Sequence, residues 1–442
     1  MDTMNKAGMF CFCCLLALLT GAGTAAALNY FHVSPNGTGT GSRLDPTNLQ
    51  DALDRAGTSS TDNYIFLRQG TYRGNFHFQS TTDKILDISG GWKDDYQVQV
   101  ADPTKTVLTG TGQDSVLKIN DIDNNTFSGN ILISHLTVRN GHGEIGGGIY
   151  AVTTPPGRIT ISDTIIENNS ATSQGGGCAL ISVDPSFSSG DRVLLEKSII
   201  RNNRATGYMD GNSHKYGEGG GCIIAVSSHT MINNSLVYGN SAGTAGTFGG
   251  IGGGLSLPAL DGFLAIVNTT ITDNRVYAQK DNTDSSAGGI ALYTLDQAWG
   301  PAEVRIVNSI IYGNQALAGA TVADLLNFLS NYPPGSSIGI RYSDIGELGT
   351  YGGVTPDLQN TLHVNPRFSR TAATRLYLLA GSRCIDSGEN IPGMSPVDLA
   401  GNRRPQDGDG DGKATTNMGC YEKVVHYPWH MFIPAFVSGS RR

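Results

Sequence analysis

Charged residues, aromatic residues and long apolar segments are all scarce in this 442-residue chain. Only 15% of its residues are charged and 8% are aromatic. We find no convincing amphipathic helix beyond two short candidates, at residues 49–56 and 322–329. No stretch of the mature chain reaches the roughly 18 apolar residues that a membrane-spanning helix needs. These scarcities disfavour a helical bundle and predict no transmembrane helix.

An excess of positive charge is also missing, since the formal net charge is -8. Nucleic-acid binding depends on Lys and Arg side chains that neutralise phosphates, so we expect no nucleic-acid partner. The same acidic balance disfavours tight binding of a polyanionic sugar, because long-range steering requires complementary charge.

The amino terminus has the pattern of a secretory signal peptide. Lys6 supplies the positive charge, residues 9–19 are apolar, and Ala25-Ala26-Ala27 is a small-residue cleavage site. We therefore expect residues 1–27 to be removed. The mature protein is predicted to be secreted or to lie at the cell surface.

Two motifs recur along the chain in the same phase. The first is a six-residue segment that starts with a small polar residue or His and ends in Asn. The second is a run of small residues, usually Gly-Gly-Gly, a short distance later. The Asn residues are Asn140, Asn169, Asn203, Asn240, Asn274 and Asn314, and the runs start at Gly146, Gly175, Gly219, Gly252 and Ala287.

Short strands broken by Gly turns at this spacing predict a solenoid of stacked parallel coils. One repeat cannot bury its own apolar face, whereas stacked repeats can. Stacking about 4.8 Å apart aligns equivalent side chains, so we expect all six Asn residues to form one internal column. Coil length varies mainly between the Asn and the Gly run, which predicts that the insertions emerge on one face.

Residues 130–345 resemble the pectate-lyase-like, or pectin-lyase-fold, right-handed parallel β-helix proteins. The Ser-Ile-Ile-x-x-Asn and Gly-Gly-Gly pattern is also similar to bacterial polymorphic surface proteins. Residues 31–37, 49–53 and 70–72 resemble the amino-terminal cap of such proteins. The resemblance implies an all-β fold with an N-terminal cap and first coils at 28–129, repeats at 130–345, and last coils with a small C-terminal module at 346–423.

Residues 382–388, 396–405 and 419–422 resemble the choice-of-anchor Q module of bacterial surface β-helix proteins, which implies attachment to the cell envelope. A tail at 424–442 follows. Its apolar run is too short to span a bilayer. Either a sorting tail or a strand that covers a sheet edge accounts for it.

Four cysteines remain in the mature chain: Cys178, Cys222, Cys384 and Cys420. An even number in an exported chain predicts disulfides, and the lack of a C-x-x-C pair among them disfavours zinc. Cys178 and Cys222 follow consecutive Gly runs, so we expect them to be stacked and bonded. Cys384 and Cys420 stand where the anchor family has Ala, which suggests that these two also meet.

The acidic loop of the end module predicts calcium. Asp407, Asp409 and Asp411 alternate as in the first half of an oxygen-ligand calcium loop. The twelfth position is Met418, so the loop is not a standard EF-hand, and Asn417 or Glu422 is the candidate to complete the shell. The alternative is a solvated acidic turn.

The insertion face carries the remaining polar and aromatic candidates. A non-catalytic surface that contacts glycan would use His142, Tyr208, Tyr216 and Tyr277. A calcium-dependent polysaccharide lyase would instead use Lys215 or His214 as the base, with Asp210 or Glu218 holding the cation. Other polar residues on this face are Glu144, Lys280 and Asp281.

We favour a structural, adhesive or glycan-contacting role at a cell-surface polysaccharide or the cell envelope, without catalysis. No basic residue recurs in register at the insertions, as a row of uronate subsites would require. A hydrolase needs paired carboxylates, and the neighbours Asp94 and Asp95 point apart in an extended segment. The lyase is the alternative function, and ordinary solvated loops also account for the insertions.

Overall fold

The computed structural model describes residues 28–121, 127–182, 191–211, 213–258, 261–277, 286–293, 301–317, 320, 322–328, 334–350, 354–371 and 376–425. The predicted signal peptide, Lys280, Asp281 and most of the tail lie outside these residues. None of the helices in the described part is long and apolar enough to cross a bilayer.

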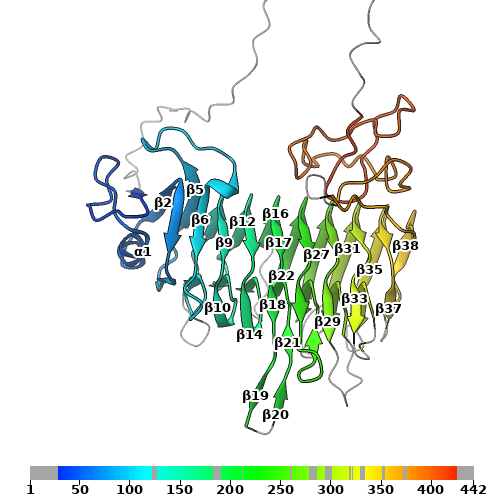
Figure 1. Ribbon diagram of the computed structural model, residues 1–442, viewed down its shortest axis with the longest axis horizontal. Coiled ribbons are helices and arrows are strands. Elements are labelled where there is room, and N and C mark those ends of the chain that lie inside the picture. The colour runs from blue at the N-terminus through cyan, green and yellow to red at the C-terminus, as the bar shows by residue number, and fades with distance from the viewer. Residues whose placement is uncertain are drawn as a thin grey trace, which may run out of the picture.

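The chain winds into a solenoid of parallel strands (Figure 1). Strands of successive coils pair in parallel along three long sheets, which we name A, B and C, and along a shorter sheet D. This architecture confirms the predicted fold class, an all-β parallel β-helix.

Sheet A supplies the first strand of each coil. Its strands are β1 (Leu28–Val33), β2 (Asp62–Arg68), β5 (Leu86–Trp92), β8 (Ile131–Ser134), β12 (Ile159–Ser162), β16 (Asp191–Glu196), β22 (Cys222–Asn233), β27 (Asp261–Val267), β31 (Ala302–Val307), β35 (Ser337–Arg341) and β38 (Asp357–Gln359).

Sheet B follows sheet A in each coil. Its strands are β3 (Gly70–Arg73), β6 (Thr106–Thr109), β9 (Thr137–Arg139), β13 (Ile165–Glu167), β17 (Ile199–Arg201), β23 (Leu236–Tyr238), β28 (Thr270–Thr272), β32 (Ile310–Ile311) and β36 (Asp344–Ile345).

Sheet C closes the coil and shares β22 with sheet A. Its other strands are β4 (Phe76–Phe78), β7 (Leu117–Ile119), β11 (Ile149–Val152), β15 (Cys178–Ser182), β26 (Leu255–Pro258), β30 (Ile290–Tyr293), β34 (Leu325–Phe328) and β37 (Leu348–Thr350).

Sheet D lies between sheets B and C, where the insertions leave the coil. Its strands are β10 (His142–Ile145), β14 (Ser170–Gln174), β18 (Arg204–Ala205), β21 (Gly217–Glu218), β24 (Ser241–Ala242), β25 (Gly250–Ile251), β29 (Arg275–Tyr277) and β33 (Gln315–Leu317).

The core is a set of stacked aliphatic columns. Inward residues alternate with outward ones along each strand of sheet A, as the period of a strand requires. One inward column is fully buried and runs through Ile133, Ile161, Leu195, Ile232, Ile266, Ile306 and Ile340. Stacking therefore buries the apolar residues of every repeat against those of its neighbours.

The Asn ladder forms as predicted for five of its six members. Asn169 Nδ2 donates to Asn203 Oδ1 (3.1 Å), and the same bond recurs from Asn203 to Asn240 at 3.0 Å. It continues through Asn274 to Asn314, with 2.9 Å at each step. The buried amides satisfy backbone groups at the bend, such as the Asn203 amide and the Ile200 carbonyl.

Asn140 is the exception, and its predicted place in the column is wrong. Ile165 pairs with Thr137, so the first repeat is shifted by one residue and Gly141 stands opposite Asn169. Asn140 instead occupies the preceding bend position, with a φ of 61°. Its exposed side chain bonds to Thr109 of the coil before.

The Gly runs are required by the ladder itself. A Cβ on Gly148 would lie 2.6 Å from Asn169 Nδ2, and one on Gly177 would lie 2.8 Å from Asn203 Nδ2. These distances are shorter than any real Cβ contact, so a side chain would displace the ladder. The two repeated motifs are thus the two halves of one packing unit.

A second ladder at the bend between sheets A and B uses hydroxyl groups. Each backbone N–H donates to the Ser or Thr hydroxyl of the next coil, for example Ser198 to Ser235 (3.2 Å). The residue before each hydroxyl adopts the left-handed conformation. The ladder comprises Thr164, Ser198, Ser235, Thr269, Ser309 and Ser343.

Helix α1 (Leu49–Gly57) lies at the amino-terminal end of the solenoid, as predicted for residues 49–56 (Figure 1). The Asn48 side chain accepts from the Asp51 amide and caps it. The helix expected at 322–329 is wrong. β34 forms there instead, because it pairs in parallel with both β30 and β37.

The carboxy-terminal module, residues 376–425, packs on the outer face of sheet B. Phe368 and Ile385 join Leu236 and Ile310 in one apolar cluster. Arg404 donates to Glu422 (2.6 Å) and to Asn234 of the solenoid (3.2 Å). The module therefore covers only the later coils, at upper right in Figure 1.

Candidate functional site

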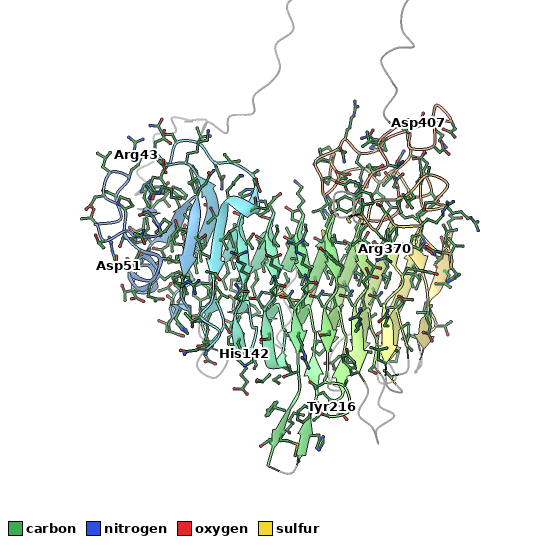
Figure 2. The ribbon with its side chains drawn as sticks, viewed as in Figure 1. Arg43, Asp51, His142, Tyr216, Arg370 and Asp407 are labelled. Atoms are coloured by element: carbon green, nitrogen blue, oxygen red, sulfur yellow. A yellow bond between two sulfur atoms is a disulfide. The ribbon has the colours of Figure 1, made fainter. Side chains whose placement is uncertain are left out.

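The predicted glycan-contact residues are spread along the insertion face rather than gathered in one site. His142 is exposed on β10, and its Nδ1 lies 2.7 Å from Ser170 Oγ. Tyr277 is at the end of β29. His142 and Tyr216 lie at the lower edge of the molecule in Figure 2, opposite Asp407.

The predicted lyase bases sit on a projecting hairpin. β19 (Tyr208–Asp210) and β20 (Ser213–Lys215) pair antiparallel and extend away from the solenoid (Figure 1). Lys215 Nζ lies 3.6 Å from Asp210 Oδ2, and both side chains are exposed. The His214 ring contacts Phe248 at 5.6 Å between centroids. A hairpin exposed in this way does not enclose a substrate.

Glu218 does not join these residues. Its carboxylate accepts from Gln174 Nε2 (3.1 Å) and from the Tyr293 hydroxyl (3.0 Å). Burial raises the pKa of Glu218, so the group is a buried acceptor in a polar network. Glu218 therefore has partners other than the hairpin residues, whereas the alternative that Asp210 holds a cation stays a prediction.

Asp94 and Asp95 likewise form no catalytic pair. Asp94 is 95% exposed and lies 3.6 Å from Arg68 Nε. Asp95 Oδ1 accepts from the Gln97 amide at 3.1 Å and thereby stabilises a turn. The two residues lie in a turn and not in the extended segment that the sequence predicted, and each carboxylate has a structural partner.

The acidic loop of the end module gathers three carboxylates, but not the predicted three. Asp407 and Asp409 are joined by Asp386, and their ligand oxygens all lie within 4.8 Å of one another. Asp386 Oδ1 is buried without a hydrogen-bond partner. Asp411 lies outside this cluster and its Oδ1 accepts from the Lys413 amide, so its role as a ligand stays a prediction.

Sequence reasoning missed Asp386 because it lies about twenty residues before the loop. Its Oδ2 accepts from the amides of Gly408 and Asp409, at 2.9 Å each. Burial, with Asp409 and Asp407 nearby, raises the pKa of Asp386 to about 6. The loop thus folds around this carboxylate.

Of the two predicted disulfides, the one in the solenoid forms and the one in the end module does not. Cys178 and Cys222 are register partners on β15 and β22 and form a disulfide, with 4.6 Å between their Cα atoms. Cys384 and Cys420 are both buried but free, so the second expected bridge is wrong. Cys384 Sγ lies 3.4 Å from Asp344 Oδ2, and the Cys420 amide donates to Thr270.

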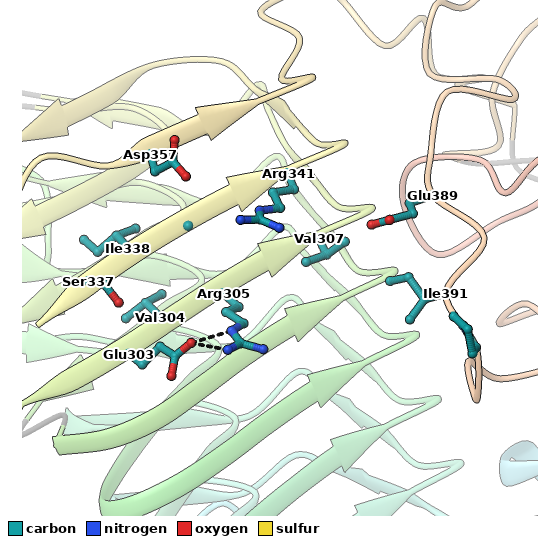
Figure 3. Close-up of a pocket in the computed structure, with 12 residues that line it drawn as sticks. Glu303, Val304, Arg305, Val307, Ser337, Ile338, Arg341, Asp357, Glu389 and Ile391 are labelled. Atoms are coloured by element: carbon teal, nitrogen blue, oxygen red, sulfur yellow. Dashed lines mark hydrogen bonds and ion pairs between the residues drawn. The ribbon is translucent and has the colours of Figure 1, made fainter.

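A groove of about 450 Å³ lies on the outer face of sheet A (Figure 3). Its floor is the outward residues of β31, β35 and β38, and its far wall is a loop of the end module. It presents guanidinium and carboxylate groups side by side. The charged and polar lining is Glu303, Arg305, Ser337, Arg341, Asp357 and Glu389.

The two arginine side chains of this groove differ in whether they have an ion-pair partner. Arg305 pairs with Glu303 and stacks over the Phe263 ring, 5.2 Å from its centroid. Arg341 is exposed and has no ion pair among the residues that the structure describes. A Cβ on Gly339, between them, would meet nothing within 4 Å, so the floor of the groove is open.

The groove was not predicted from the sequence. Residues 303–307 place Glu303 and Arg305 at alternating positions, and residues 337–341 add one charged residue, Arg341; these charges were the available signal. The wall formed by Glu389 and Ile391 comes from a distant segment. No local pattern indicates that this segment faces sheet A.

No protein-family model matches the chain, and no curated protein matches its sequence. Two solved structures align with most of it. The crystal structure of pectate lyase Pel9A is 14% identical with a TM-score of 0.46, and covers 91% of this chain and 98% of its own. The crystal structure of Escherichia coli YbhC is 14% identical with a TM-score of 0.26, and the alignment covers 88% of this chain and 86% of YbhC.

Proposed function

We propose that this chain is an exported surface β-helix that binds glycan in the groove on sheet A without cleaving it. The observation that carries the proposal is the row of guanidinium and carboxylate groups on a rigid, open sheet face. Sugar hydroxyls both donate and accept hydrogen bonds, so they pair with both kinds of group. Arg341, which lacks an ion pair among the described residues, is the principal donor.

The absence of catalysis is supported by the exposure of the candidate groups, since Lys215 and its neighbour Asp210 both lie open to solvent. A lyase base and its cation must face the same sugar. Lys215 is on the projecting hairpin, whereas Glu218 is held by Gln174 and Tyr293. Export is supported by the Cys178–Cys222 disulfide, since such bonds persist in oxidising compartments. Envelope attachment through an anchor-type end module belongs to the same proposal.

The test is affinity electrophoresis of the mature protein in gels that contain a neutral β-glucan or polygalacturonate. We expect retardation by the neutral polymer, and Arg341→Ala to weaken it about tenfold, the loss typical of one charge-assisted hydrogen bond. Arg158→Ala is the matched control, since Arg158 is an exposed Arg next to β12 of the same sheet. Equal behaviour of both variants, or formation of unsaturated uronate products, would contradict the proposal.

We also propose that Asp386, Asp407 and Asp409 hold a calcium ion in the end module. Hard cations prefer carboxylate oxygens, and the unpaired buried Oδ1 of Asp386 is such a ligand. Calcium would then raise the melting temperature, because it binds the folded state. Asp409→Asn should abolish this rise, and Asp411→Asn should retain it. If chelator leaves the melting of the parent unchanged, the loop is a solvated turn.

A further inference from the structure

The first strands of sheet A carry a row of aromatic side chains on their outer face that ends in a carboxylate. Tyr30 on β1 is in register with Tyr64 on β2, and Tyr64 with Asp87 on β5. The two tyrosine rings stack, with 5.4 Å between centroids. Leu132 on β8 follows in the same column. Neighbouring strands are about 4.8 Å apart, so the carboxylate lies beside the Tyr64 ring.

The aromatic surface extends into the next column along the strands. Phe66 lies 5.8 Å from Tyr30 and 4.6 Å from Trp92, measured between ring centroids. Tyr30 is 50% exposed, so part of this surface is open to a ligand. Aromatic faces carry negative electrostatic potential and attract cations.

Asp87 has no charged or hydrogen-bonding partner among the described residues. Two basic groups at the ends of these strands are engaged elsewhere: Lys84, just before β5, lies 2.9 Å from Asp83, and Arg68, at the end of β2, lies 3.6 Å from Asp94. Burial alone raises the pKa of Asp87 to about 6. A partly buried carboxylate without a partner is costly when ionised, and a bound cation would relieve that cost.

We propose that Tyr30, Tyr64 and Asp87 form a binding site for the ammonium group of an amino sugar in a polysaccharide. The carboxylate supplies a charge-assisted hydrogen bond, and the stacked rings supply a face for the cation and the sugar ring. The net charge of -8 favours approach of a cationic polymer. This site goes beyond the proposed groove, because it lies on the first strands of sheet A and not on the last.

The experiment is isothermal titration of the mature protein with a fully deacetylated glucosamine oligomer at neutral pH. The matched ligand is the N-acetylated oligomer, which has the same ring but no ammonium group. We expect binding of the amine alone. Asp87→Asn keeps the shape of the side chain and should weaken binding about tenfold, as loss of a charge-assisted bond does. Tyr64→Leu should weaken it as well.

Thr160→Ala is the control variant, because Thr160 lies two strands further along the same outward column and should leave binding unchanged. Arg341→Ala should also retain it, so this proposal and the glycan groove fail independently. Equal binding of the N-acetylated oligomer, a folded Asp87→Asn variant that binds as the parent does, or preference for a lysine oligomer would each overturn the proposal.

Discussion

Asn240 shows how much one residue contributes to the solenoid. Its Nδ2 donates to Ile200 O (3.0 Å) and Asn274 Oδ1 (2.9 Å). Its Oδ1 accepts from both the backbone and the side chain of Asn203, at 2.9 and 3.0 Å. All these groups are buried, so the side chain satisfies polar atoms in two neighbouring coils.

We predict that Asn240→Ala lowers the free energy of unfolding by about 3 kcal/mol, because it leaves several buried groups unpaired. Urea denaturation measures this. Asn140→Gly is the control, since Asn140 lies outside the ladder and Gly tolerates its left-handed conformation. Its effect should stay within about 0.5 kcal/mol. Similar losses in both variants would show that the ladder has no special role.

We predict that Asp87 makes the folded protein less stable as the pH rises toward neutrality. Its neighbours across the outer face are Tyr64 on β2 and Leu132 on β8. The pKa is raised from 3.8 to about 6 by burial, so the folded state holds the proton more tightly than the unfolded state. This contribution is greatest below pH 3.8 and is lost as the pH rises through about 6.

At neutral pH, Asp87→Asn should therefore be more stable than the parent, by about 3 kcal/mol at most. Below pH 3.8 this advantage should disappear, since the parent side chain is then neutral as well. Thermal unfolding of both proteins across this range is the measurement. Parallel pH profiles would mean that solvent reaches the carboxylate.

At the scale of elements, the end module contains a buried ion pair and is held to the solenoid by hydrogen bonds. The side chains of Arg404 and Glu422 are both 0% exposed. Arg404 also donates to Asn234 (3.2 Å), and Asn308 exchanges two hydrogen bonds with the Glu389 backbone (2.7 and 2.8 Å). These bonds tie the bends between sheets A and B to the module.

Arg404→Met should destabilise the docked module by about 3–5 kcal/mol, because it leaves Glu422 buried and unpaired. Limited proteolysis should then cleave the module while the solenoid survives. The double variant Arg404→Met with Glu422→Leu removes both charges and should recover much of the loss. If protease cleaves the double variant as fast as the single one, the hydrogen bond of Arg404 to Asn234 contributes more to docking than the ion pair does.

At the scale of the whole molecule, the two ends of the solenoid differ. Helix α1 packs against β4 and β1 at the amino-terminal end. At the other end, β38 pairs with β35 and with no other strand of the described residues, and its three residues are exposed. Each coil contacts mainly its neighbours, so stability is a sum of local terms.

Hydrogen exchange should therefore be slowest in β23 and β28, which lie beneath the end module, and fastest in β38. Opening should spread from the carboxy-terminal end toward the module, because end coils lose one neighbour. Mass spectrometry of peptides from quenched exchange measures the order. Uniform exchange in all coils would indicate one cooperative unit instead.

Periodicity alone predicted the solenoid, the Asn ladder and the cap helix. These features are encoded locally, since each repeat carries the same Asn and Gly residues and stacks on a copy of itself. The pairing of Cys178 with Cys222 followed from the same phase. The misplacement of Asn140 shows the limit of this reasoning, because a shift of one residue in the first repeat is invisible without strand register.

Contacts between distant segments were accessible only in three dimensions. Asp386 joins Asp407 and Asp409 in the acidic cluster, Cys384 meets Asp344 rather than Cys420, and Glu389 lines the same groove as Arg341. The segment at 322–329 has a helical pattern, yet strands on both sides impose β34 on it. The physical reason is the same in each case: local sequence sets bends and core columns, whereas packing on an outer sheet face depends on which distant segment covers it.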